Sequence, residues 1–188
     1  MSNSLPKVNT INNAVHFLSM ISPKRFLNKL TWIDIGKSLY NVTKGSTSGD
    51  RSGLSVWIAY THMALDNEEV PAFIASSVGD TCNALYPTFN TSSLTLKTLA
   101  WYAKCDSPEN YQKWHDEWCN EALEASLDVM DGNVAEFLYR IYRLNTGYSE
   151  RHWYQFKNDK WRKSSPNFCQ KIIHSVISRY EIYSKRHP

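Results

Sequence analysis

Apolar residues recur along most of this chain at intervals of three and four positions, the spacing of one face of an α-helix. Ile11, Val15 and Leu18 show this pattern near the start of the chain. The same spacing predicts helices over residues 11–21, 23–27, 31–44, 54–63, 68–78, 94–105, 108–127 and 134–141. It also predicts a last helix after Ser165-Pro166, with an apolar stripe of Phe168, Ile172, Ile173, Val176, Ile177 and Tyr180.

Local sequence signals mark several of the expected helix ends. Ser22 and Ser107 each precede a proline, which is typical of an N-cap followed by the first helical residue. Thr31 and Asp34 have the spacing of a capping box, with Asp in place of the usual Glu. Two breaks are expected, at the Gly-, Ser- and Thr-rich stretch 43–53 and at Asp131-Gly132-Asn133.

One stretch departs from helical spacing. Aromatic residues alternate with polar ones over 153–156 and again over 160–162, on either side of the turn-forming Lys157-Asn158-Asp159. Strict alternation around a turn sequence is typical of a β-hairpin. The sequence therefore predicts a mainly α fold, a compact helical domain with one small β-hairpin near residues 153–162.

Length and composition limit the class of protein. The chain has 188 residues, of which 42% are hydrophobic and 21% charged, as in ordinary globular domains. No apolar run approaches the roughly 20 residues of a membrane span. The N-terminal residues are polar and lack the apolar stretch of a signal peptide. We expect an intracellular protein without a membrane segment.

The net charge of +3 conceals basic ends and an acidic middle. Residues 1–60 contain seven basic and two acidic residues, whereas residues 61–137 contain three basic and thirteen acidic ones. Residues 138–188 contain eleven basic and three acidic residues, a net charge of +8. This pattern could present a positive face to a polyanion and an acidic face to a basic partner, or folding could intermix the charges.

The sequence offers no motif for catalysis, and we expect no metal and no cofactor. His115 and Cys119 lie four residues apart, but no second pair completes the roughly four ligands of a structural zinc site. Gly36-Lys37-Ser38 matches the end of a phosphate-binding loop, but Thr31 stands where that loop requires its first glycine. No Asp-x-Asp pair of a two-metal site is present. We expect no catalytic residues in this chain.

Aromatic and basic residues are interleaved in the last third of the chain. Aromatic rings stack on unpaired bases and cationic side chains follow the phosphates, so this composition favours contact with single-stranded nucleic acid. The tryptophans could instead be core residues that anchor the hairpin. The candidate DNA-binding residues are Arg140, Arg143, Arg151, Trp153, Lys157, Lys160, Trp161, Arg162 and Lys163.

Three stretches resemble a known family. Residues 32–41 and 53–60 carry a Trp, then Gly and Leu, then Leu-x-x-Trp. Residues 96–111 are similar to a Thr-Leu-x-x-Trp-Ala-Lys-x-Asp-x-Pro-x-x-Tyr pattern, although Tyr102 occupies the usual tryptophan position and Trp101 stands one place early. Together with residues 134–139 and 153–161, they resemble the helical primase C-terminal and linker region of the poxvirus-type primase–helicases of large DNA viruses.

The resemblance implies a domain organisation and a function. It implies a primase C-terminal-like helical domain over 30–130 and a segment leading toward a helicase domain over 131–188. Residues 1–29 match nothing in the family and are expected to form an N-terminal helical extension. The implied function is a non-catalytic DNA-binding connector in a replication enzyme of the host cytoplasm or a viral replication factory.

The implied partners are DNA, bound weakly and without sequence preference, and neighbouring primase and helicase domains, with homo-oligomerisation through the parent protein possible. A parent protein of that family would be a primase and an NTP-dependent helicase. The alternative is a stand-alone helical module whose acidic middle binds a host or viral partner.

Overall fold

The computed structural model describes residues 11–43, 51–66, 69–74, 77–90, 93–128, 130–142, 145–157 and 160–186. The chain forms two compact units, unit 1 over Met1–Trp114 and unit 2 over His115–Pro188. The mainly α fold is confirmed, and the predicted hairpin is part of a three-stranded antiparallel sheet. Unit 1 holds α1 (Ile11–Leu18), α2 (Lys24–Leu27), α3 (Lys29–Thr43), α4 (Ser52–Leu65), α5 (Val78–Leu85), the short helix η1 (Tyr86–Thr88) and α6 (Leu96–Asp106).

Helix α7 (Pro108–Ala125) contains the boundary between the two units. Unit 2 continues with the short helix η2 (Ser126–Asp128), α8 (Asp131–Tyr142), strands β1 (Thr146–Ser149), β2 (His152–Lys157) and β3 (Lys160–Lys163), and α9 (Phe168–Arg186). Helices α1 and α2 pack on α3 and its neighbours within unit 1. The division expected at residues 29/30 and 130/131 stays a prediction.

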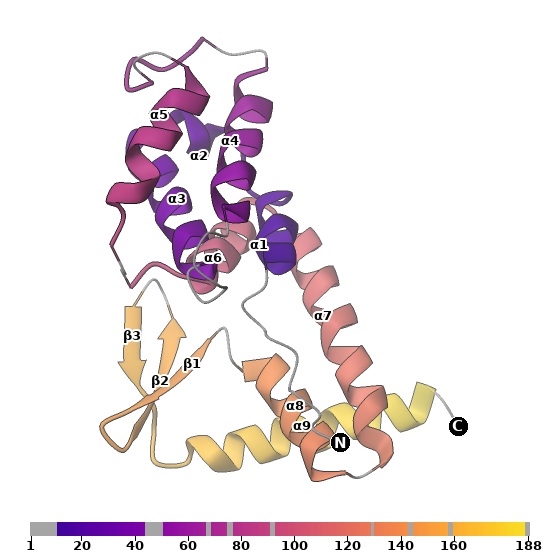
Figure 1. The fold of residues 1–188 in the computed structure, drawn as a ribbon. Helices are drawn as coiled ribbons and strands as arrows, with labels where there is room; N and C mark the ends of the chain where they lie inside the picture. Colours follow the sequence, from indigo (N-terminus) through magenta and orange to yellow (C-terminus); the bar gives the residue numbers. More distant parts are fainter. Residues whose placement is uncertain are drawn as a thin grey trace. The chain divides into compact units, whose positions relative to one another are not determined.

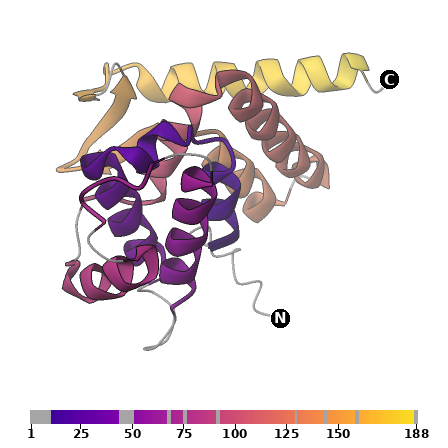
Figure 2. The ribbon, with the colours of Figure 1, turned by 90° about the horizontal axis from the view of Figure 1, so that it is seen from above.

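Unit 1 is a bundle in which α3 and α4 pack along each other and α5 packs on α4 (Figure 1; the same helices are seen from above in Figure 2). Its centre is aromatic: Trp32 on α3 and Trp57 on α4 are fully buried, with ring centroids 4.4 Å apart. Leu39 and Leu54 are buried beside them. The Trp, Leu and Leu-x-x-Trp positions that carry the family resemblance are therefore core positions.

Two of the expected helix starts are wrong by one or two residues. Helix α3 begins at Lys29 because the Oδ1 atom of Asn28 accepts hydrogen bonds from the backbone N–H groups of Leu30 and Thr31, at 3.0 and 3.3 Å. The Thr31 hydroxyl donates to the carbonyl of Arg25 instead of capping a helix. Helix α2 begins at Lys24, and its N-cap residue, Pro23, provides no side-chain hydrogen bond.

The helix expected over 68–78 is wrong, because the described residues in 69–77 are not helical. Pro71 lies in this stretch, and α5 begins only at Val78. Ser77 fixes that start, since its hydroxyl oxygen accepts from the backbone N–H of Asp80 at 3.0 Å. A serine N-cap with an acidic residue at the third position is the pattern that stops a helix from extending backwards.

The break expected at Asp131-Gly132-Asn133 is also wrong, because these residues form the first turn of α8. The Asn133 amide donates to Asp128 at 2.9 Å, and it also donates to the carbonyl of Ala125, at 3.0 Å. These bonds tie the first turn of α8 to the residues before it. The loop expected over 43–53 falls mostly outside the described residues, and α4 begins at Ser52.

The core of unit 2 joins α7, α8 and α9. Phe137 is fully buried on α8, and the Tyr180 ring of α9 packs edge-on against it, with centroids 5.5 Å apart. The stripe expected on α9 is only partly confirmed, because Ile173 and Ile177 are 57% and 49% exposed. Each follows a half-buried residue, Ile172 or Val176, and adjacent helical positions point about 100° apart. The buried cluster consists of Cys119, Ala122, Leu123, Phe137 and Ile141.

Gly36 gives a test of the helix packing in unit 1. A Cβ atom added at Gly36 would lie 2.7 Å from the ring of the fully buried Trp57. We expect Gly36→Ala to lower the free energy of unfolding by about 1–3 kcal/mol, because the buried ring or one of the two helices must shift to admit the methyl group. Gly132→Ala is the matched control, since no described residue lies within 4 Å of its added Cβ. Urea denaturation that finds both variants equally stable would contradict this packing.

Candidate nucleic-acid interface

The sheet of unit 2 gathers most of the residues that the sequence predicts to bind DNA. In antiparallel pairs, directly opposite residues share a face of the sheet. The register pairs Tyr148 with Trp153 and Gln155 with Arg162. We define the Trp153 face as Tyr148, Trp153, Gln155, Lys160 and Arg162, and the Trp161 face as Tyr154, Phe156, Trp161 and Lys163.

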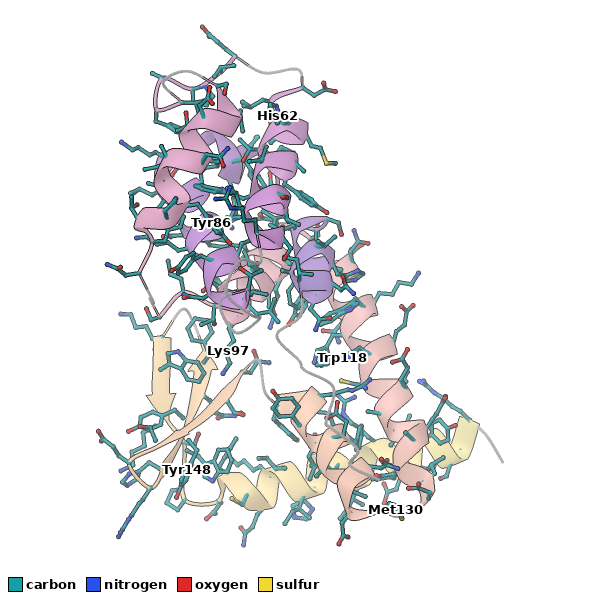
Figure 3. The ribbon with its side chains drawn as sticks, in the orientation of Figure 1. His62, Tyr86, Lys97, Trp118, Met130 and Tyr148 are labelled. Carbon is teal, nitrogen blue, oxygen red and sulfur yellow. The ribbon has the colours of Figure 1, made fainter. Side chains whose placement is uncertain are left out.

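Aromatic rings form a row along the Trp153 face. The Tyr148 and Trp153 ring centroids are 5.1 Å apart, and Trp153 lies 5.8 Å from Phe168 at the start of α9. Phe168 is buried, whereas Tyr148 and Trp153 are 61% and 39% exposed. Tyr148 is labelled on the sheet in Figure 3. Trp153 therefore packs against the buried Phe168 and is still partly exposed to solvent.

The Trp161 face is packed differently. The Trp161 ring lies 5.4 Å from the Phe156 ring, centroid to centroid. It also reaches β1, where a Cβ added at Gly147 would lie 3.5 Å from its Cζ3 atom. An aromatic ring that covers a strand glycine stabilises a sheet. Trp161 is 46% exposed, so it is neither a buried core residue nor an isolated surface ring.

The turn between β1 and β2 carries another predicted residue, Arg151. Glu150 and Arg151 have φ angles of 48° and 63°, and a two-residue hairpin turn with both central residues at positive φ is of type I′. A type I′ turn prefers the sequence Asn-Gly. Because Glu150-Arg151 occupies the turn instead, the sequence did not reveal β1 or its Tyr148. The imidazole of His152 hydrogen-bonds the carbonyl of Glu150 at 2.7 Å, and Arg151 is exposed at the tip.

Strand β3 presents the strongest positive charge of the sheet. Lys160, Arg162 and Lys163 are all exposed on it, and β3 pairs only with β2 among the described strands. The backbone of Lys157 pairs with that of Lys160 at the end of the hairpin. The side chain of Lys157 and the whole of Arg143 lie outside the part of the chain that the structure describes.

Arg140 is held within the helices of unit 2, so the structure does not bring it to the sheet. Its guanidinium donates to Glu136 at 2.8 Å and to the carbonyl of Trp118 at 3.0 Å, and it lies 3.2 Å from the Glu121 carboxylate. The guanidinium also lies 5.3 Å from the centre of the Trp118 ring, and its side chain is only 16% exposed. These contacts engage Nε and Nη1 of the guanidinium with groups of unit 2 itself.

A groove of about 610 Å³ lies between α7 and α9 in unit 2. Asp116 and Glu124 line it from α7, and Arg179 and Arg186 line it from α9. Walls of opposite charge do not favour a polyanion, so Arg179 and Arg186 are not part of the interface described here. The sequence could not indicate this groove, because it depends on the packing of two helices far apart in the chain.

The residues considered for phosphate binding, catalysis or metal binding make contacts within the fold instead. Residues 36–38 lie inside the continuous helix α3, whose amides bond within the helix, and the Ser38 hydroxyl donates to the carbonyl of Asp34 at 2.8 Å. Burial raises the pKa of the Cys119 thiol to about 11, although its sulfur lies 3.8 Å from the His115 ring. A thiol that stays protonated at neutral pH is a poor nucleophile. Among the described residues, no group of three His, Cys, Asp or Glu could hold a metal ion.

Comparison with known proteins gives a distant viral relative. No protein-family model matches the chain, and no solved structure matches it. The chain is 23% identical, over 94% of its length, to the protein of Invertebrate iridescent virus 3 named "Putative helicase 121R". The matched region is only 19% of that protein's length. Within the described residues, no helix is both long and apolar enough to cross a membrane. The chain is thus distantly similar to one segment of a helicase-related viral protein.

Proposed function

We propose that this chain is a non-catalytic, DNA-binding module of a viral replication protein, and that it binds single-stranded DNA through the sheet of unit 2. The observation that carries the proposal is the edge strand β3, where Lys160, Arg162 and Lys163 are all exposed and the first two share a face of the sheet with the exposed ring of Trp153. Cations that follow phosphates next to a ring that can stack on a base are the two elements of single-strand binding.

The wider charge pattern supports a polyanionic partner. Within residues 146–163, which contain the sheet, there are five basic residues and only two acidic ones. Phosphate contacts carry no sequence information, so the expected binding is weak and independent of sequence. The similarity to one segment of the iridovirus protein supports a role in replication. In this proposal, catalysis belongs to other segments of a larger protein, and this chain connects them.

Salt dependence of binding tests the proposal. The variant Lys160→Glu, Arg162→Glu, Lys163→Glu removes three expected phosphate contacts from β3. Each lost contact on a single strand should flatten the slope of log K against log salt by about 0.7, so the triple variant should lose about 2 from the slope. Fluorescence anisotropy with a labelled oligo-dT strand, measured across a salt series, gives this slope.

The matched control is Lys24→Glu, Lys29→Glu, Lys104→Glu, which reverses three exposed cations of unit 1. Both variants lower the net charge by the same amount, so a difference between them reports the location of binding and not the overall charge. The proposal expects the control to keep the wild-type slope to within about one contact. Absence of wild-type binding at low salt, or an equal loss in both variants, would contradict it.

A further inference from the structure

The exposed aromatic rings of the sheet differ in their packing contacts, and this difference distinguishes the Trp153 face from the Trp161 face. Trp153 lies between Tyr148, at 5.1 Å, and the buried Phe168, at 5.8 Å. This support fixes the indole before any ligand arrives, which lowers the entropic cost of binding. Tyr148, 61% exposed at the outer end of the row, offers the most accessible ring of the sheet.

Cationic side chains accompany this ring pair on the same face. Arg162 lies opposite Gln155, two residues along β2 from Trp153, and Lys160 lies opposite Lys157. Diagonal neighbours across a sheet are about 7–8 Å apart, within reach of a long side chain. The Trp153 face therefore holds aromatic rings at its β1–β2 end and positive charge toward its β2–β3 end.

The Trp161 face has a structural task that the Trp153 face lacks. The Trp161 ring crosses the sheet from β3 to cover Gly147 on β1, and it also packs on Phe156. If the ring turned away to meet a base, it would uncover that glycine and weaken the packing of the sheet. Trp161 is thus better explained by sheet stability than by base recognition.

We propose, on the basis of the DNA-binding function above, that unpaired bases stack on the Tyr148–Trp153 pair while Lys160 and Arg162 bind the adjoining phosphates. The stacking site lies on the Trp153 face, and Trp161 holds the sheet together. The substrate is single-stranded DNA, because a duplex buries the faces of its bases in its own stack and offers this site only phosphates.

The test compares removal of a ring on each face. Tyr148→Leu and Trp153→Leu should each weaken binding of a labelled oligo-dT strand by about 5- to 150-fold, the measured range for one stacked base. Tyr148→Phe keeps a ring and should bind like the wild type. Trp161→Leu should lower the melting temperature but leave the affinity of the folded protein within about threefold. Binding of a duplex of equal length should not respond to Tyr148→Leu.

Melting curves and circular dichroism identify any variant that fails to fold. Tyr148→Leu should perturb folding least, because most of the Tyr148 side chain is in solvent. Wild-type affinity in Tyr148→Leu and Trp153→Leu, with loss only in Trp161→Leu at unchanged melting, would overturn the stacking site. Equal affinity of the wild type for single strand and duplex would also overturn it, although the phosphate-binding function would stand. Absence of any wild-type binding would instead contradict the proposed function itself.

Discussion

Replacing Trp57 with alanine is expected to lower the free energy of unfolding by about 3–5 kcal/mol, the range for truncation of a large buried aromatic residue. Trp57 is fully buried, and its ring centroid lies 4.4 Å from that of Trp32 and 5.5 Å from that of Phe89. The cavity would open where α3 and α4 meet, next to Gly36. Since total stability is typically about 5–15 kcal/mol, this one change would remove a large fraction of it.

The two central tryptophans should respond differently to phenylalanine. The Trp32 Nε1–H donates to the Thr61 hydroxyl at 2.9 Å, whereas within the described residues the buried Nε1–H of Trp57 has no acceptor. Trp32→Phe therefore loses a hydrogen bond of about 1 kcal/mol, and Trp57→Phe loses none. Urea denaturation should rank stability as wild type, Trp57→Phe, Trp32→Phe, then Trp57→Ala. A Trp57→Phe variant less stable than Trp32→Phe would contradict this account.

The sequence predicted helices best where packing and local signals agree. Pro108 opens α7 as expected, and the described part of the helix that contains Trp32 ends at Thr43, close to the predicted end. Local signals failed where another residue competed for the same backbone groups. Asn28 took the capping role expected of Thr31, and Ser77 began α5 inside a stretch read as helical.

The composition of the candidate site was predictable, but its geometry was not. Alternation revealed β2 and β3, because Trp153 and Trp161 stand in strands joined by a recognisable turn. Strand β1 stayed hidden because its turn uses Glu150 and Arg151 at positive φ. Without β1, neither the Tyr148 ring nor the Gly147 beneath Trp161 could be placed, so the two tryptophans could not be assigned different roles.

Asp106, on α6, bonds to Ser22 and Arg25, which lie far from it in the sequence. Its ionisation should make the stability of unit 1 depend on pH. Its carboxylate accepts from both Nε and Nη2 of Arg25, at 2.6 and 2.7 Å, and from the backbone N–H of Ser22 at 2.9 Å. The Arg25 guanidinium also lies 4.2 Å from the centre of the Tyr102 ring. Asp106 is the last residue of α6, where the helix dipole disfavours a negative charge, so its ionisation depends on these partners.

We expect Asp106→Asn to cost about 2–4 kcal/mol at pH 7. Breaking a buried pair costs about 3–5 kcal/mol, and the solvent that still reaches Arg25, whose side chain is 22% exposed, reduces this. Asp66→Asn, at an exposed position at the end of α4, is the control and should change stability by no more than about 0.5 kcal/mol.

The pH dependence of the same variant identifies the cause. Burial acts to raise the pKa of Asp106, but the hydrogen bonds from Arg25 and Ser22 outweigh it and hold the pKa below its ordinary value. A carboxyl group whose pKa is lower in the folded state stabilises the fold fully above about pH 4, the pKa of an Asp in the unfolded chain. This stabilisation is lost as the pH falls through the pKa of the folded state. Urea denaturation at pH 7 and at successively lower pH should therefore show wild type and Asp106→Asn converging in acid. A constant difference between them at every pH would mean that Asp106 acts through packing or neutral hydrogen bonds, because only the ionised carboxylate gives a term that acid removes.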